Sequence, residues 1–243
     1  MEFMPENAPA VVLGFLFTCF LLLVAGVILV HGLAVGRRSR AWKAVVGAVV
    51  VLGVYLGILL TASFASGEKV LAPGEQKYFC EIDCHLAYSV LNVATTKSLG
   101  SPSNQKTAEG TYYVVTVKTW FDERTISNRR ARNMPLTPNP RSVAVVDESG
   151  REYIPSPDGQ KALERAQGKS IPFSRLIRPG ESYTTDLVFD LPSGIRNARL
   201  FITTADWPTR LIIGHENSPF HKKIFFQLGP QSERVTSMNV MTK

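Results

Sequence analysis

The chain has 243 residues, 45% of them hydrophobic, and its 27 Lys and Arg exceed its 20 Asp and Glu by a net charge of +7. The apolar residues concentrate near the N-terminus. In the interval 8–65 the only charged residues form a short basic cluster: Arg37, Arg38, Arg40 and Lys43. This division excludes a uniformly soluble globular protein, because no soluble domain needs two long apolar runs in succession.

Two apolar segments, 10–34 and 44–65, precede everything else of interest. A bilayer core about 30 Å thick is crossed by about 20 apolar residues in a helix. We therefore predict a membrane α-helical hairpin within residues 1–66, with spans of about 10–34 and 44–65.

The basic cluster indicates the orientation of this hairpin. Short cytoplasmic loops are enriched in Lys and Arg, so residues 36–43 are expected on the cytoplasmic side. The N-terminus and everything after Ala65 then lie outside the cytoplasm, and Trp42 lies where an aromatic anchor belongs. In the alternative, the second run is a signal sequence cleaved after Ala65, although it is longer than the apolar region usual for signals.

Residues 67–243 are predicted to form one β-rich domain. Tyr78–Val93 alternates between apolar and polar residues, which is typical of a half-buried strand. A loop at Ser98–Gly110 and a strand at Thr111–Asp122 follow, and then a long connection. Further strands are expected at Ser142–Asp147, Arg151–Ile154, Ser182–Pro192, Arg199–Thr204, Arg210–Ile213 and Lys223–Leu228, with a short helix at Asp158–Gln167.

Seven or eight short strands with almost no helix favour an all-β, antiparallel sandwich. In its core we expect Leu187, Phe189 and Leu191, with Asp190 facing solvent.

A turn and strand in this domain carry a family resemblance. The run Pro179-Gly180-Glu181-Ser182, followed by Phe189-Asp190-Leu191-Pro192, resembles a family of bacterial extracytoplasmic immunoglobulin-like domains of unassigned function. The resemblance covers roughly Thr111–Leu228. It implies an immunoglobulin-like sandwich with an interaction or accessory role and no catalysis of its own. Together with the predicted hairpin, it leads us to expect the chain in the bacterial inner (cytoplasmic) membrane.

The sharpest chemical cluster lies at Cys80, Cys84 and His85. Two thiols and an imidazole this close could hold copper or zinc. The motif is similar to that of the copper-bearing subunit of respiratory oxidases, but Tyr88 and Leu91 stand where that family has His and Met. An unbroken strand would hold Cys80 and Cys84 about 13 Å apart, too far for a disulfide.

The predicted location outside the cytoplasm favours a disulfide between Cys80 and Cys84, because disulfides persist there. We expect a Cys80–Cys84 disulfide with the strand bent or bulged between the two residues; two separately buried thiols and a metal site remain the alternatives.

Two smaller patterns complete the sequence. His215 and His221 flank a Ser-Pro turn and are more typical of turn residues than of metal ligands. Gly53 and Gly57 form a small-x3-small pattern of the kind used in helix association. No nucleophile elbow, phosphate-binding loop or zinc-protease helix is discernible.

The sequence thus predicts a membrane-anchored extracytoplasmic interaction or accessory protein that needs no cofactor and is not an enzyme. Its expected partners are the lipid bilayer and other membrane-protein subunits, bound through the helices and the β-domain surface, with no nucleic acid. The alternative function is a redox or metal-handling protein that uses Cys80, Cys84 and His85.

Overall fold

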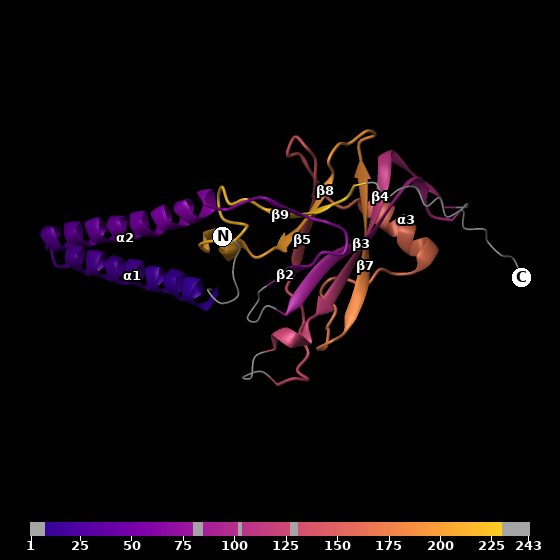
Figure 1. Ribbon diagram of the computed structural model, residues 1–243. Helices are drawn as coiled ribbons and strands as arrows, with labels where there is room; N and C mark the ends of the chain where they lie inside the picture. Colours follow the sequence, from indigo (N-terminus) through magenta and orange to yellow (C-terminus); the bar gives the residue numbers. More distant parts are fainter. Residues whose placement is uncertain (1–7, 80–84, 102–103, 127–130, 230–243) are drawn as a thin grey trace, which may run out of the picture. The chain divides into compact units, whose positions relative to one another are not determined.

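A computed structural model describes residues 8–79, 85–101, 104–126 and 131–229, drawn in Figure 1. The chain forms two compact units. The first holds the N-terminal region up to Lys69 together with Thr203–Ile224, and the second holds Val70–Phe79, His85–Ile202 and the chain from Phe225 on.

Two helices dominate the first unit. Helix α1 spans Ala8–Ala34 and helix α2 spans Arg38–Phe64, so both are helical over the predicted spans. Helix α2 begins six residues earlier than its predicted span, because the chain reverses within Val35–Arg37, where Gly36 has φ +69°. Most of the basic cluster therefore lies in the first turns of α2 and not in a loop.

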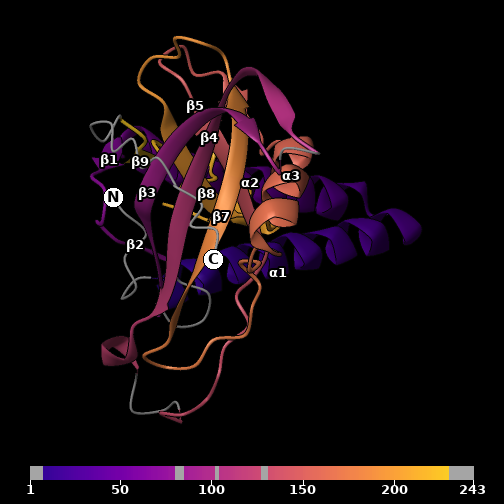
Figure 2. The same ribbon diagram turned by 90° about the vertical axis from the view of Figure 1, so that its right-hand side faces the viewer.

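A four-stranded sheet in the second unit has the order β2-β3-β4-β7. Its strands, which Figure 2 shows side by side, are antiparallel: β2 Lys77–Phe79, β3 Leu86–Leu99, β4 Lys106–Phe121 and β7 Ser182–Leu191. The β3–β4 connection is shorter than the predicted loop at Ser98–Gly110, since both strands extend into it.

A five-stranded sheet has the order β1-β9-β8-β5-β6. Its strands are β1 Lys69–Leu71, β9 Ile224–Gln227, β8 Arg199–Thr204, β5 Arg141–Val146 and β6 Glu152–Tyr153. The pairs β5–β6 and β8–β9 are antiparallel, and the β5–β6 pair joins the strands predicted at Ser142–Asp147 and Arg151–Ile154.

The two sheets share one core and form the predicted β-sandwich. Lys77 of β2 donates a hydrogen bond to the Ile202 carbonyl of β8 over 2.7 Å. Arg141 of β5 lies 4.4 Å above the Phe79 ring and donates to the Tyr88 hydroxyl. Side chains from both sheets are at most 1% exposed: Tyr88, Val115, Val117, Phe121, Phe189, Leu191, Leu200 and Ile202.

Helix α3, Pro157–Gln167, confirms the predicted short helix. The hydroxyl of Ser156 caps it by accepting from the Gly159 amide, and an added Cβ at Gly159 would lie 2.6 Å from the Val188 side chain. The Gln160 side chain accepts from the Val188 amide and donates to the Asp186 carbonyl. Because α3 covers this part of β7, Val188 is buried as fully as Phe189, which alternation alone would not predict.

Two predicted strands are wrong. Tyr78–Val93 is not one strand, since Phe79 of β2 pairs with Leu86 of β3 in antiparallel register and the chain reverses between them. Arg210–Ile213 is also not a strand, because a 3-10 helix occupies Trp207–Leu211 with Pro208 in its first turn.

The carboxylate of Asp190 holds the start of β4. It accepts from the Glu109 amide over 2.8 Å and from the Gly110 amide over 2.9 Å. At Gly110 an added Cβ would lie 2.0 Å from the Leu191 carbonyl oxygen, so only glycine fits this close approach. The expectation that Asp190 merely faces solvent is wrong, because its side chain satisfies two backbone donors.

We expect Phe189→Ala to lower the free energy of unfolding by about 3–5 kcal/mol, because it leaves a cavity in the core. Asp190→Ala should cost about 1–3 kcal/mol, since two amides lose their acceptor. Urea unfolding of the full chain in detergent measures both, with the exposed Thr184→Ala as a control close to the wild type. An Asp190→Ala variant as stable as the control would contradict this role.

Candidate functional site

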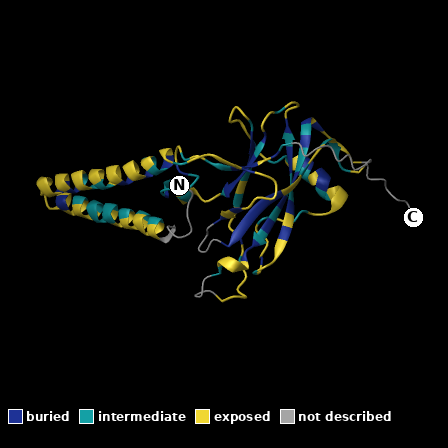
Figure 3. Cartoon of the chain, in the orientation of Figure 1, coloured by how far each residue is buried: buried dark blue, intermediate teal, exposed yellow. Residues whose placement is uncertain are grey.

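The surfaces of α1 and α2 are the largest apolar feature of the described chain. Figure 3 shows most of both helices as exposed, and both are long and apolar enough to cross a membrane. The outward side chains more than half exposed include Leu13, Phe17, Phe20, Leu23, Val27, Val49, Val54 and Ile58. An exposed apolar patch of this extent marks a surface that a lipid or another protein covers.

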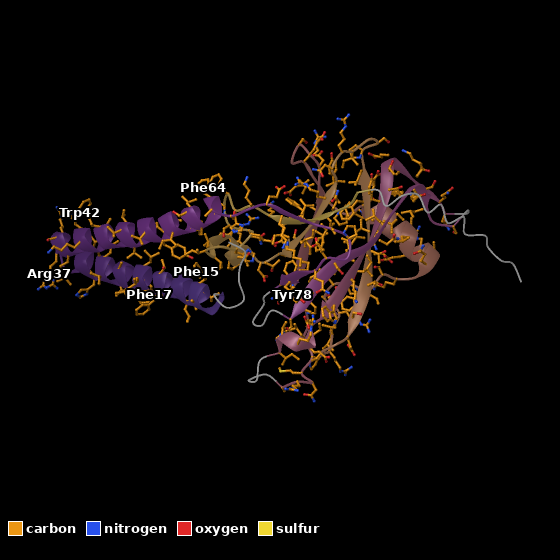
Figure 4. The ribbon with its side chains drawn as sticks, in the orientation of Figure 1. Phe15, Phe17, Arg37, Trp42, Phe64 and Tyr78 are labelled. Carbon is orange, nitrogen blue, oxygen red and sulfur yellow. The ribbon has the colours of Figure 1, made fainter. Side chains whose placement is uncertain are left out.

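The connected end of the two helices is basic and tightly packed. Arg37 and Trp42 lie there in Figure 4, and Phe64 lies at the far end of α2. An added Cβ at Gly32 would lie 3.1 Å from the Ala41 amide nitrogen, so the helices approach closely just before the turn. The side chain of Trp42 is 68% exposed.

One stripe of α2 differs from the rest of its surface. Tyr55, Leu59 and Ser63 are 8%, 1% and 0% exposed, and their spacing of four residues places them on one helix face. The Tyr55 ring lies 6.2 Å from the ring of Phe15, and its hydroxyl donates to the Leu211 carbonyl over 2.6 Å. Within the first unit, the segment after β8 therefore contacts the hairpin directly.

His85 lies in the core of the second unit. Its side chain is fully buried and stacks on Phe121 with a centroid distance of 5.2 Å. Its Nδ1 forms a 2.5 Å hydrogen bond with the Thr125 hydroxyl, and its carbonyl accepts from the Asp122 amide. These contacts hold the ring just before the start of β3.

Asp122 begins the short 3-10 helix η1, Glu123–Thr125, and was not singled out by the sequence. Its carboxylate accepts two hydrogen bonds from the Arg124 guanidinium at 2.9 Å and one from the Tyr78 hydroxyl at 2.8 Å. The hydrogen bonds from Arg124, followed by the one from Tyr78, lower the pKa of Asp122 from 3.8 to about 2. Burial and the bond to Asp122 raise the pKa of Tyr78.

The sequence does contain a pattern that could have identified Asp122 as a capping residue. Asp at the end of a strand, followed by a short turn, is a preferred N-cap that accepts from the backbone two residues later. The Arg124 amide makes this bond to Asp122 over 3.1 Å.

Cys80 and Cys84 lie outside the described residues, so the disulfide and the metal site with His85 both stay predictions. The geometric objection to the disulfide no longer applies, because it assumed an unbroken strand through Tyr78–Val93. Within the described ranges, no three or more His, Cys, Asp and Glu side chains are grouped to hold a metal ion.

The two histidines near the C-terminal end serve local turns. His215 Nδ1 accepts from the Asn217 amide over 3.0 Å, and His221 Nδ1 lies 2.6 Å from the Lys222 carbonyl. The turn interpretation of His215 is therefore confirmed.

Comparisons with known proteins place this sandwich in a family. A family model described as a domain of unknown function, DUF4352, matches residues 81–210, which is more than half of the chain. The chain belongs to this family. A comparison with proteins of curated function finds no match.

Several solved structures are distantly similar. The secreted protein MPT63 of Mycobacterium tuberculosis has 11% identity and a TM-score of 0.41 over 67% of this chain and 99% of that one. An uncharacterised β-sandwich protein of Clostridium difficile has 12% identity and a TM-score of 0.38 over 68% and 96%. A conserved hypothetical protein of Bacillus anthracis has 15% identity and a TM-score of 0.37 over 56% and 89%.

We expect Asp122→Asn to lower the free energy of unfolding by about 1–2 kcal/mol at pH 7, a figure reduced because Arg124 is mostly exposed. The folded pKa of Asp122 lies below its unfolded value, so its stabilisation is complete above about pH 4 and lost toward pH 2. The difference between wild type and variant should therefore shrink over this interval.

Urea unfolding of the full chain in detergent at several pH values measures the effect. Glu148→Gln, at an exposed turn position, is the control and should follow the wild type throughout. A wild type–Asp122→Asn difference that stays constant from pH 7 to pH 2 would contradict the assignment.

Proposed function

We propose that this chain is a membrane-anchored extracytoplasmic interaction or accessory protein of the bacterial inner membrane, with no catalysis of its own. Helices α1 and α2 cross the bilayer, residues 36–43 face the cytoplasm, and the N-terminus and the β-rich unit lie outside. The observation that carries the proposal is the exposed apolar surface of the two helices, which a bilayer would cover.

The distribution of charge supports the orientation. The basic side chains of the hairpin gather at its connected end, and within the described residues neither helix contains an acidic side chain. Such a cluster is typical of the cytoplasmic side.

The carboxylates of the sandwich with lowered pKa values support an interaction role, because both hold local structure. Asp122 caps η1. Asp147 has its pKa lowered to about 2 by hydrogen bonds, first of all from the Ser149 hydroxyl, in the β5–β6 turn.

The best-formed hollow among the described residues has a volume of about 190 Å³ and lies beside Tyr113 and Asn197. Pockets for drug-sized ligands typically measure about 300–1,000 Å³.

Glycines on α2 support a helical partner. An added Cβ at Gly53 or Gly57 would meet no other described atom within 4 Å, so α1 does not use this face. Small residues four apart let a second helix approach closely. This face therefore fits a second helix, and we propose that another membrane subunit supplies it.

The full chain, tagged and purified in a mild detergent, should elute together with a second membrane subunit in constant proportion. A double Gly53→Leu, Gly57→Leu variant should lose that subunit, because the added side chains hold the helices apart. The matched control is Leu52→Phe with Ile58→Phe, at positions that are 44% and 52% exposed and lie on other faces of α2. A chain that elutes alone, or a glycine variant that behaves like the control, would contradict the proposal.

A further inference from the structure

The segment between β8 and β9, Ala205–Lys223, makes several contacts with the outer half of α2, and we call it the collar segment. Beside the bond from Tyr55 to the Leu211 carbonyl, Phe220 stacks on Phe64 with a centroid distance of 5.4 Å and an interplanar angle of 19°. The Lys222 amide donates to the Ser66 hydroxyl over 2.8 Å. The collar segment is therefore attached at the end of α2 and also further along it.

The depth of the second attachment follows from helix geometry. Tyr55 precedes Phe64, the last residue of α2, by nine positions. At 1.5 Å per residue, Tyr55 lies about 13 Å along the axis from the outer end of α2. The hydrocarbon core is about 30 Å thick, so part of the collar segment reaches below the headgroup level if α2 spans the bilayer.

The burial pattern of α2 agrees with this placement. Leu59 and Ser63 are almost completely buried, on the same face as Tyr55. Val54 and Ile58, on other faces of the same turns, are 59% and 52% exposed. The rest of the chain covers one stripe of the outer half of α2 and leaves side chains on other faces, such as Val54 and Ile58, exposed.

Part of the backbone of the collar segment is paired within its own turns. Five amides each donate to the carbonyl three residues before them: Thr209 to Asp206, Ile212 to Thr209, His215 to Ile212, Ser218 to His215 and His221 to Ser218. Irregular backbone at membrane depth is tolerated only where its polar groups are paired within the protein. These turns meet that requirement for the five amides.

Side chains complete the pairing. The Ser218 hydroxyl donates to the Ile212 carbonyl, and the Asn217 amide group donates to the Thr204 carbonyl and the Thr209 hydroxyl. Ser218 itself is only 4% exposed.

Large aromatic side chains point away from this paired interior. Trp207 is 63% exposed and Phe220 is 68% exposed, with the cations Arg210 and Lys222 nearby in sequence and also exposed. Phe220 has φ +63°, a conformation that is costly for a bulky residue. Aromatic rings next to Lys and Arg are typical of the membrane–water interface.

We propose that the collar segment is a second membrane-contact element, which lies in the outer interface of the bilayer and inserts Trp207 and Phe220 among phospholipids. This inference rests on the proposed membrane anchorage. Charge contributes little, because Asp206 and Glu216 offset most of the basic side chains in the segment. The contact is therefore with the interface itself, and a zwitterionic lipid suffices.

The chain contains three tryptophans, which suit a test by fluorescence quenching. Three full-length variants keep one tryptophan each, Trp42, Trp120 or Trp207, with the other two changed to Phe. Each is reconstituted into phosphatidylcholine vesicles that carry bromine near the headgroup end of the acyl chain or near its methyl end. Trp42 reports on the hairpin, and Trp120, in β4 of the sandwich, is the water-side control.

Trp207 should lose the same fraction of its fluorescence as Trp42, and more with bromine near the headgroup end than near the methyl end. Trp120 should lose none. Quenching of Trp42 with a Trp207 response equal to that of Trp120 would overturn the collar proposal and leave the anchor intact. Absence of quenching at both Trp42 and Trp207 would overturn the membrane anchor itself.

A second probe position is available if the variant that keeps only Trp207 fails to fold. Phe220→Trp, in a chain whose three native tryptophans are changed to Phe, should be quenched like Trp207. Adding Tyr55→Phe to the Trp207 variant removes the hydrogen bond to Leu211 and should reduce the quenching. Unchanged quenching after Tyr55→Phe, or no quenching at position 220, would count against insertion of the collar segment.

Discussion

The apolar outer surface of α1 and α2 is the constraint on which the account of this protein depends. Side chains such as Leu13, Phe17 and Val49 are more than 60% exposed. Each large apolar side chain kept out of water gains about 1.5–3 kcal/mol, so a surface of this size needs a non-aqueous environment. Under our proposal that environment is the bilayer, and the basic residues at the connected end of the helices then decide which side each terminus occupies.

Aspartate side chains stabilise the sandwich at turns and at the ends of its strands. Asp122, Asp147 and Asp190 each accept hydrogen bonds from backbone amides at a turn or at the start of a strand. An amide left unpaired in such a place costs free energy, and a short carboxylate is well suited to reach it. The carboxylates that look chemically distinctive in this domain thus act on the fold.

Elements governed by local periodicity could be predicted from the sequence. The two helices, the strand at Thr111–Asp122, the strand ending at Pro192 and the short helix at Asp158–Gln167 all follow patterns of apolar residues at helical or strand spacing. The β-sandwich could also be predicted, because many short strands with little helix leave few other architectures.

Features that depend on contacts between distant residues could not be predicted. The alternation through Tyr78–Val93 is the same whether the segment is one strand or two. Only the pairing of Phe79 with Leu86 shows that there are two. The burial of Val188 requires α3 to lie on that face, and the role of Asp190 requires the amides of Glu109 and Gly110. Likewise, nothing local indicates that Tyr55 within an apolar helix binds the Leu211 carbonyl.

The central claim is that two helices cross the bilayer and leave both termini outside the cytoplasm. Reporter fusions test it most directly: a reporter active only outside the cytoplasm is joined after Lys243, and one active only inside is joined after Ser39. The account predicts that both reporters are active and that the mature protein retains its N-terminal helices. A silent reporter at either position, or a mature chain that begins at Ser66, would contradict it.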